Sequence, residues 1–435
     1  MLIVSVLTCF AIGILSVVSF GQETKINPLW AKIDQISSEV ESKCISWRRD
    51  FHQNPELGNR EFRTSKLIAK HLQSLGMEVK TGIAHTGVVG ILRGKKDTPV
   101  VALRADMDAL PVTEAVDLPF SSKVKAQYEG KQVGVMHACG HDAHIAMLMG
   151  VAEVLSKLKD ELPGTVKFIF QPAEEGAPQG EEGGAALMIK EGVLTSPTVD
   201  AIFGLHVASV PAPAGMIFYR SGGIMASTDK LTIAIKGSQT HGGMPWFGVD
   251  PIVVASQVVL GLQTIVSRQT NLTETPAVIT IGSIIGGNRF NIIPEKVVME
   301  GTIRVFDPKI QNDIHNRIQK TSRSIAESSG ATAEVTIEKL GPVTFNNINL
   351  TQKMIPTLER VAGRGRVLIT PPTTTGEDFA FYQEKVPGLF FFLNVKPAEG
   401  KPIPNHSPYF YTDEKALIVG VRAMSNLAID FMANK

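Results

Sequence analysis

The stretch His137-Ala138-Cys139-Gly140-His141-Asp142-Ala143-His144 gathers three histidines, a cysteine and an aspartate within eight residues. Thiolate and imidazole are preferred ligands of zinc and of neighbouring transition metals, and a Cys-x-His pair can bind one cation from a single loop. Asp142 is interpreted as the N-cap of a helix over residues 142–159. The structural alternative is a polar loop before a helix, with a buried cysteine. The stretch therefore predicts a metal site beside the start of a helix.

The composition indicates a globular protein of two domains. The 435 residues exceed the usual length of one domain. Lysine plus arginine (43) almost balances aspartate plus glutamate (42), so the chain has neither a basic field for nucleic acid nor a polybasic patch for a membrane surface. We therefore expect a small-molecule substrate and no nucleic-acid partner.

The N-terminus differs from the rest of the chain. Leu2 to Phe20 is almost wholly apolar, and Ser19-Phe20-Gly21 has small residues at the outer positions of a cleavage site. We predict a signal peptide over residues 1–21 and an exported protein, either periplasmic or secreted. An uncleaved membrane anchor is the alternative, since a run of about 20 apolar residues can span a bilayer. No later segment is expected to have the length to span a membrane.

The two cysteines of the mature chain give no disulfide framework. Cys44 lies on a segment with helical apolar periodicity and is expected to pack in the core. Cys139 is better explained as a thiolate ligand of a metal.

Apolar runs alternate with helical segments along the chain, which predicts an α/β fold with a largely parallel sheet. The runs expected to form this sheet lie at 88–92, 100–103, 166–170, 201–205 and 389–395. In open α/β sheets, sites form beyond the carboxyl ends of the strands. Side chains suited to metals follow these ends and are expected to meet at one edge of the sheet: Asp106, Glu174, Glu175, His206 and His406.

The adjacent acids Glu174 and Glu175 are expected to have different tasks. Neighbouring residues that leave a strand point in different directions, so one carboxylate can bind a cation while the other faces a substrate. A nearby divalent cation also offsets their mutual repulsion. The free carboxylate could take a proton from an attacking water molecule and pass it to a leaving amine. A solvated acidic turn is the alternative.

Residues 228–336 follow another pattern, with the order β-α-β-β-α-β of a ferredoxin-like module. Asp250-Pro251 and Asp307-Pro308 each open a predicted helix. The module is inserted between strands of the larger sheet. We therefore predict a catalytic domain in two parts, 22–224 and 341–435, and an inserted domain over 225–340, with hinges near Gly222-Gly223 and Gly341-Pro342.

The insert carries polar residues of its own. His241 lies in a glycine-containing loop after a strand and could stabilise an oxyanion. Asn291 belongs to the next hairpin, and Arg304 could bind a substrate carboxylate with both ends of its guanidinium group. The alternative for Arg304 is a surface residue of a strand.

Taken together, these motifs resemble the metal-dependent aminoacylase/carboxypeptidase amidohydrolases, in the branch of the hippurate and auxin-conjugate hydrolases. The resemblance covers nearly all of the chain after the predicted signal. The matching stretches are 48–56 (RRDFHQNPE), 104–111 (RADMDALP), 137–144 (HACGHDAH), 171–175 (QPAEE), 204–206 (GLH), 240–241 (TH), 291–294 (NIIP) and 376–379 (GEDF).

The resemblance implies a hydrolase with two divalent cations (zinc, manganese, cobalt or nickel) and a lid domain that also forms a homodimer or a higher homo-oligomer. It implies Glu174 as general base and later acid, Asp106 as a support for the ligands with an unassigned partner, and His241 as a group that reaches the substrate, even across a dimer. Residues 376–378 would line the site without an assigned step. The implied ligands, with Cys139 bridging, are Cys139, His141, Glu175, His206 and His406.

The function expected from these observations is hydrolysis of the amide bond of N-acyl amino acids to a carboxylic acid and an amino acid. A dipeptidase or carboxypeptidase with the same metals is the second hypothesis, and a substrate panel separates the two. A third hypothesis is an exported protein that binds a metal or an amino acid without catalysis. Such a binder would have little use for a free Glu174 beside a ligand.

Overall fold

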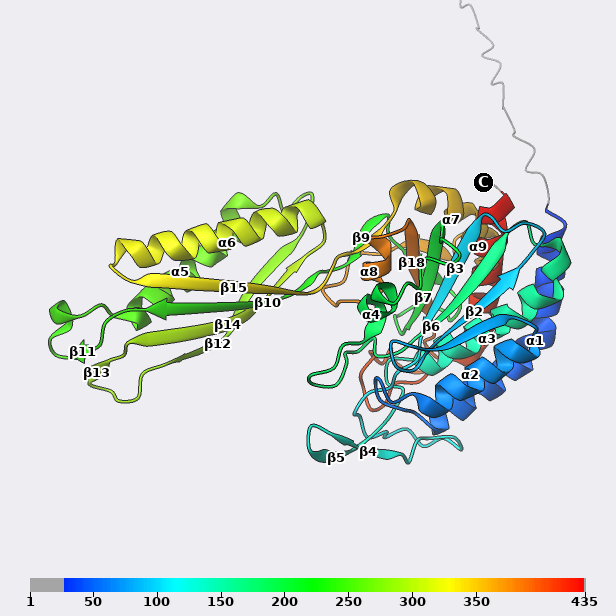
Figure 1. Cartoon of the computed structure of the whole chain (residues 1–435), viewed down its shortest axis with the longest axis horizontal. Helices are drawn as coiled ribbons and strands as arrows, with labels where there is room; N and C mark the ends of the chain where they lie inside the picture. The colour runs from blue at the N-terminus through cyan, green and yellow to red at the C-terminus, as the bar shows by residue number, and fades with distance from the viewer. Residues whose placement is uncertain (1–26, 434–435) are drawn as a thin grey trace, which may run out of the picture.

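The computed structural model of the protein describes residues 27–433, so the predicted signal peptide at 1–21 lies outside the described residues. The chain builds a large α/β domain and a smaller domain of two helices on a four-stranded sheet, joined by extended segments (Figure 1).

The large domain is organised on a sheet whose central strands run parallel, as the alternation of strands and helices predicted. The central pairs β6–β3, β3–β7 and β7–β18 are parallel, whereas β1–β2, β2–β6 and β18–β8 are antiparallel. The order across the sheet is β1 (Glu78–Ile83), β2 (Gly87–Arg93), β6 (Thr165–Gln171), β3 (Val100–Asp106), β7 (Ala201–Ala208), β18 (Gly388–Asn394), β8 (Ile217–Tyr219) and β17 (Val367–Ile369).

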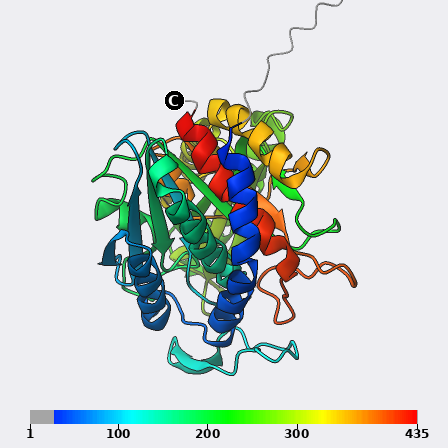
Figure 2. The ribbon, with the colours of Figure 1, turned by 90° about the vertical axis from the view of Figure 1, so that its right-hand side faces the viewer.

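Helices cover both faces of this sheet, which explains why its central strands are continuous apolar runs. Phe390 and Phe391 are both fully buried, and they point into the cores on opposite faces. Figure 2 shows α1 and α9 side by side over the first face, in agreement with their mutual contacts. The helices of the first face are α1 (Leu29–Gln53), α2 (Phe62–Ser74), α3 (His141–Lys157), α7 (Ile348–Ala362) and α9 (Leu417–Ala433), and those of the second are α4 (Gly184–Lys190) and α8 (Ala380–Gln383).

The start of α3 differs from the prediction. Gly140, with a φ of 89°, occupies the N-cap position, and no side chain caps the helix. Asp142 lies inside the first turn, where its carboxylate accepts hydrogen bonds from Arg48 at 2.8 Å and from His52 Nδ1 at 2.8 Å. The N-cap assignment of Asp142 was therefore wrong, because a buried arginine competes for its carboxylate. Cys44 is buried as predicted.

The smaller domain has the predicted βαββαβ order, with all strand pairs antiparallel. Asp250 and Asp307 cap its two helices by accepting hydrogen bonds from the backbone N–H groups two and three residues ahead. Its elements are β10 (Thr228–Lys236), α5 (Pro251–Thr264), β12 (Ala277–Gly286), β14 (Lys296–Val305), α6 (Pro308–Ser328) and β15 (Thr332–Gly341), and the sheet order is β12-β14-β10-β15.

Short elements complete the described residues. A ribbon of β9 and β16 lies where the chain passes between the two domains, and β11 and β13 form a ribbon at the far end of the smaller domain (Figure 1). Their bounds, with those of the β4–β5 hairpin and the short helices, are β4 (Lys125–Tyr128), β5 (Lys131–Gly134), η1 (Lys159–Glu161), β9 (Gly222–Met225), β11 (Thr240–His241), η2 (Pro245–Phe247), η3 (Ile265–Gln269), β13 (Ile292–Ile293), β16 (Thr344–Asn346) and η4 (Glu414–Ala416).

Two helical segments of the described chain are long and apolar enough to cross a bilayer, Pro251–Gln269 and Glu414–Ala433. The expectation that no later segment has this length was therefore wrong. The second segment is 78% buried inside the protein, as a core helix is. The first is only 33% buried, because one side of α5 packs on its sheet and the other faces outward.

Candidate metal centre

Five donor side chains from distant parts of the chain meet at one edge of the large sheet. The Sγ atom of Cys139 lies 3.3 Å from His206 Nε2 and 3.3 Å from His406 Nε2. His406 Nε2 in turn lies 2.9 Å from a carboxylate oxygen of Glu175. The strand β7 continues to Ala208 and therefore contains His206, whereas the strand was predicted to end at Leu205. The sequence-predicted donors that the structure brings together are Cys139, His141, Glu175, His206 and His406.

The spacing of these donors fits bound cations. Two ligands of one tetrahedral zinc ion, with Zn–S of about 2.3 Å and Zn–N of about 2.0 Å, lie about 3.5 Å apart. Cys139 belongs to two groups whose donor atoms all lie within 4.8 Å of one another, one with His141 and His206 and one with Glu175 and His406. A thiolate shared by two groups can bridge two cations, which is the position predicted for Cys139.

Backbone carbonyls orient two of the imidazole rings. His141 Nδ1 donates to the Asp108 carbonyl at 2.8 Å, and His206 Nδ1 donates to the Val207 carbonyl at 2.7 Å. Each Nε2 is thereby left as the acceptor, which is how proteins prepare a histidine for a metal. His141 Nε2 is buried and has no hydrogen-bond partner in the described part of the chain. A cation bound at this nitrogen would satisfy the orphaned atom.

The loop around His406 is held against the Cys139 loop. His406 has a φ of 69°, and its backbone N–H donates to the Ala138 carbonyl at 2.8 Å. The side chain of Asn405 donates to the carbonyls of Cys139 at 2.9 Å and of Val207 at 3.1 Å. A left-handed residue between these bonds turns the imidazole back toward the thiol.

Glu174 and Glu175 lie in different electrostatic surroundings. Burial raises the pKa of Glu174 well above its ordinary value, and Glu377 and Glu175 raise it further. Burial also acts to raise the pKa of Glu175, but the hydrogen bond with His406 and the charge of His141 outweigh it and leave the pKa lowered. The environments thus push the two pKa values apart, as acid–base roles require.

Asp106 supports the site from behind, and the structure supplies the partners that the sequence left open. One carboxylate oxygen lies 2.5 Å from His144 Nδ1, and the other accepts from Arg104 at 2.6 Å. His144 Nε2 accepts from the backbone N–H of Val207 at 2.8 Å. Burial acts to raise the pKa of Asp106, yet His141, His144 and Arg104 hold it well below its ordinary value.

Arg104 is a functional residue that the sequence analysis missed. Its fully buried guanidinium group also donates to Gln171 at 2.9 Å and to Asp378 at 2.8 Å, and it lies 3.0 Å from Glu377. An arginine inside an apolar strand was the available signal, because such a group must find carboxylates when water is excluded.

Asp108 was also missed. Besides the carbonyl contact, its carboxylate lies 3.3 Å from His141 Nδ1 and accepts the backbone N–H of Glu175 at 3.0 Å. One residue thus touches two of the predicted ligands. Its position two residues beyond Asp106, on the same side of an extended segment, was the signal that could have found it.

The predicted residues of the smaller domain do not all reach this site. His241 and Asn291 lie together on the β11–β13 ribbon, where the backbone N–H of Gly242 donates to the Asn291 carbonyl at 2.9 Å. This ribbon is at the end of the smaller domain farthest from the large sheet (Figure 1). Arg304 lies instead at the junction of the domains, where it donates to the Thr228 hydroxyl at 2.7 Å.

A cavity of about 170 Å³ opens beside the donors. Glu174 lies on its wall together with the segment of Thr375, Gly376 and Glu377, so two of the three residues 376–378 line the cavity, whereas Asp378 instead accepts hydrogen bonds from Arg104 and Gln171. Apolar side chains, among them Met225 and Phe392, form the remaining wall. The arrangement offers a free carboxylate, a donor set for cations and room for a small acyl group or side chain.

Comparisons with known proteins identify the family of the chain. Residues 102–430 match the model of peptidase family M20/M25/M40. Thermostable carboxypeptidase 2 of Saccharolobus solfataricus is 41% identical over 403 residues, which cover 92% of this chain and 98% of that protein. N-acetyl-L-cysteine deacetylase of Bacillus subtilis is 37% identical over 381 residues, covering 88% of this chain and 86% of that protein.

A solved structure leads to the same family. The YXEP protein of Bacillus subtilis, described as a dinuclear metal-binding peptidase of the M20 family, superposes with a TM-score of 0.76 at 35% identity, covering 92% of this chain and 99% of that one. The resemblance read from the motifs is confirmed: the chain belongs to peptidase family M20/M25/M40 and is a metal-dependent hydrolase of amide bonds.

Proposed function

We propose that the protein hydrolyses the amide bond of N-acyl amino acids, with Glu174 as the catalytic base and acid. The observation that carries the proposal is a carboxylate only 10% exposed, Glu174, on the wall of a small cavity, 3.8 Å from His141 Nε2 and next to the donor Glu175. A relative that deacetylates N-acetyl-L-cysteine supports this substrate class. A relative that is a carboxypeptidase keeps peptide cleavage as the second candidate.

The proposed ligands are Cys139, His141, Glu175, His206 and His406. Two divalent cations held by this set would supply a lowered pKa for the attacking water and polarisation of the acyl carbonyl. Glu174 accepts the proton of the attacking water and returns it to the leaving amine, a task that suits a group whose pKa burial has raised. Zinc, manganese, cobalt and nickel all suit a site of thiolate, imidazole and carboxylate.

The domain over residues 225–340 is proposed to be a lid through which two copies of the chain associate. Support comes from apolar side chains exposed on its outer surface, including Leu260 (70% exposed), Ile285 (69%) and Phe290 (96%). Soluble proteins rarely leave such surfaces uncovered. In this domain arrangement, His241 and Asn291 lie far from the metal centre of their own chain (Figure 1). In a dimer, they could instead reach the metal centre of the second copy.

Two further assignments rest on the sequence. We propose export of the protein through its N-terminal apolar segment, with membrane anchoring as the alternative if that segment stays in place. We also propose that Arg304 binds the substrate carboxylate. Its place at the domain junction supports this role, because the segment of Gly376 that lines the cavity passes close to its guanidinium group.

The proposal is tested with Glu174→Gln. The variant keeps the size of the side chain but cannot transfer a proton, so kcat should fall by about 100- to 10,000-fold while bound metal stays unchanged. Glu182→Gln, at an exposed acid nearby, serves as the control. A panel of N-acyl amino acids and dipeptides with the wild-type protein separates the two candidate substrates. A near-normal rate in Glu174→Gln would remove the base from the scheme.

A further inference from the structure

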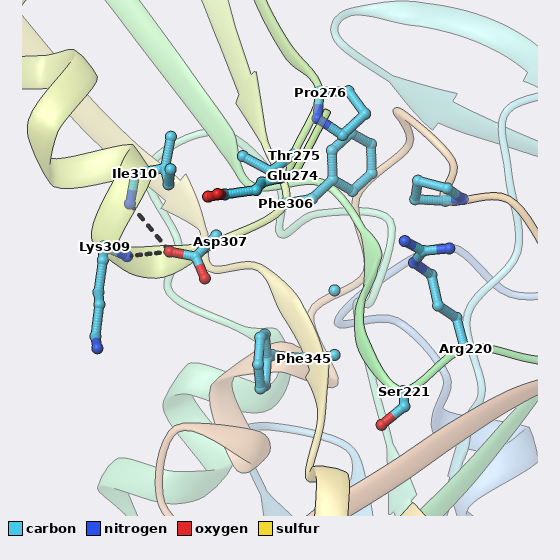
Figure 3. Close-up of a pocket in the computed structure, with 13 residues that line it drawn as sticks. Arg220, Ser221, Glu274, Thr275, Pro276, Phe306, Asp307, Lys309, Ile310 and Phe345 are labelled. Carbon is cyan, nitrogen blue, oxygen red and sulfur yellow. Dashed lines mark hydrogen bonds between the residues drawn. The ribbon is translucent and has the colours of Figure 1, made fainter. Parts of the chain in front are cut away.

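A second cavity, of about 400 Å³, lies between the two domains beside the ribbon of β9 and β16. Its volume falls within the range of small-molecule sites. The large domain contributes Arg220 and Phe345, and the lid contributes Glu274, Phe306 and Asp307 (Figure 3). We name it the hinge cavity. It shares no lining residue with the cavity at the metal centre.

Charged groups of both signs line the hinge cavity and do not pair with each other in the described residues. Arg220 and the exposed Lys309 are cations, whereas Asp307 and the exposed Glu274 are anions. Within residues 27–433, neither the guanidinium group of Arg220 nor the carboxylate of Glu274 has a hydrogen-bond or salt-bridge partner. Asp307 uses one carboxylate oxygen, Oδ1, to cap α6, and Figure 3 shows both of these hydrogen bonds. A half-buried arginine without an acceptor is a group prepared for a ligand carboxylate, which it can bind in a bidentate manner.

Apolar walls separate these charges. The ring of Phe306 is nearly fully buried, and Phe345 and Pro276 also line the space. In Figure 3, Arg220 extends from one side of the cavity, while Glu274 and Asp307 lie on the lid side. A ligand that satisfies all three features carries a carboxylate, an ammonium group and an apolar body.

We propose that the hinge cavity binds a free amino acid with an apolar side chain, as a zwitterion. Arg220 binds the carboxylate, Glu274 faces the ammonium group, and Phe306 and Phe345 contact the side chain. The origin of the ligand rests on the proposed function, in which an amino acid is one of the two products. The binding site itself rests only on the cavity.

A ligand in this position would also act on the lid. Because its walls belong to both domains, a bound amino acid stabilises the domain arrangement that forms the cavity relative to any other. If the lid must move during turnover, the amino acid lowers kcat without competing for the metal centre.

The experiment measures binding to the metal-loaded, full-length protein by calorimetry with three probes that share a benzene ring. L-phenylalanine carries both charges, benzoate only the negative one, and 2-phenylethylamine only the positive one. The variants are Arg220→Gln and Glu274→Gln. Arg323→Gln, an exposed arginine on α6 that does not line the cavity, is the control for the loss of a positive charge.

Wild type and Arg323→Gln should bind L-phenylalanine more tightly than either other probe. Arg220→Gln should weaken this binding at least tenfold, and Glu274→Gln should remove the preference for L-phenylalanine over benzoate. Added L-phenylalanine should lower kcat of the wild type and leave KM unchanged. Arg220→Gln should lose this inhibition, while its activity without added amino acid stays normal.

Equal L-phenylalanine binding by wild type and Arg220→Gln would overturn the inference, even if the protein hydrolyses N-acyl amino acids. Conversely, Arg220-dependent binding by a protein that cleaves no N-acyl amino acid would support the hinge cavity and refute the proposed function. A preference for 2-phenylethylamine would also overturn the inference, because the cation of Arg220 repels that probe.

Discussion

Replacement of Asp108 by asparagine should weaken cation binding without unfolding the protein. The side chain of Asp108 is buried, and its carboxylate lies 3.3 Å from His141 Nδ1 and 3.0 Å from the backbone nitrogen of Glu175. Asparagine has nearly the same shape but no charge. The carbonyl of residue 108, which accepts from His141 at 2.8 Å, is unchanged in the variant.

The size of the effect follows from these two contacts. A hydrogen bond to a charged group contributes about 1.5–3 kcal/mol, and one between neutral groups about 0.5–1.5 kcal/mol. The hydrogen bond from the Glu175 backbone N–H therefore loses about 1 kcal/mol when the charge is removed, and the charge contact with His141, which is not a hydrogen bond, loses about as much. Two contacts give about 2 kcal/mol, which corresponds to a roughly 30-fold higher Kd for the cation. This value lies within the loss of metal affinity, roughly 10- to 100-fold, that follows when a hydrogen-bond partner of a metal ligand is mutated.

The assay is competition between the protein and a chromophoric chelator for Zn²⁺ or Mn²⁺, with thermal melting of the metal-free variant to check its fold. Asp117→Asn, at an exposed acid without a role in the site, is the matched control. A Kd for Asp108→Asn equal to that of Asp117→Asn would refute the reasoning, because Asp108 would then contribute only its backbone carbonyl to the metal centre.

Three further predictions follow from other parts of the structure. Arg104→Met should lower the free energy of unfolding by about 3–5 kcal/mol, because buried carboxylates lose the cation that pairs with them. Arg93→Met, at an exposed ion pair, should lower it by less than about 1 kcal/mol, and denaturant titration measures both values. Metal uptake near neutral pH should release protons, so affinity for the metal should increase with pH. Burial acts to lower the pKa of His141, but neighbouring acids raise it to about 10, and burial raises the pKa of Cys139 well above its ordinary value. Calorimetry in buffers of different ionisation enthalpy measures the released protons, and a release of none would contradict the prediction. Leu260→Glu should convert the proposed dimer to monomers in light scattering, and an unchanged mass would exclude α5 from the interface.

The donor residues could be predicted because each one follows from a local pattern. An apolar run that ends at a polar residue marks a strand end, and the ends of parallel strands share one edge. Glu174, Glu175 and His406 needed no knowledge of long-range packing to be placed there. The two capped helices of the smaller domain were predicted for the same reason, since an Asp-Pro pair acts within one turn. The domain arrangement left no such local signal, so the distance of His241 from the large sheet could not be foreseen.

The supporting residues were missed because their partners depend on register between strands and on side chains from other segments. The pairing of β3 with β6 sets Asp106 opposite Gln171, and Arg104, two residues earlier on the same side of β3, then reaches both. A shift by one residue would turn Arg104 to the opposite face of the sheet. Nothing in the local sequence fixes that register, although the contacts of the Arg104 guanidinium group depend on it completely. The same dependence explains the wrong cap at Asp142, whose carboxylate accepts a hydrogen bond from Arg48, 94 positions earlier in the chain. Strand ends therefore reveal where a metal can bind, while the charges that hold the ligands become visible only after the strands are paired.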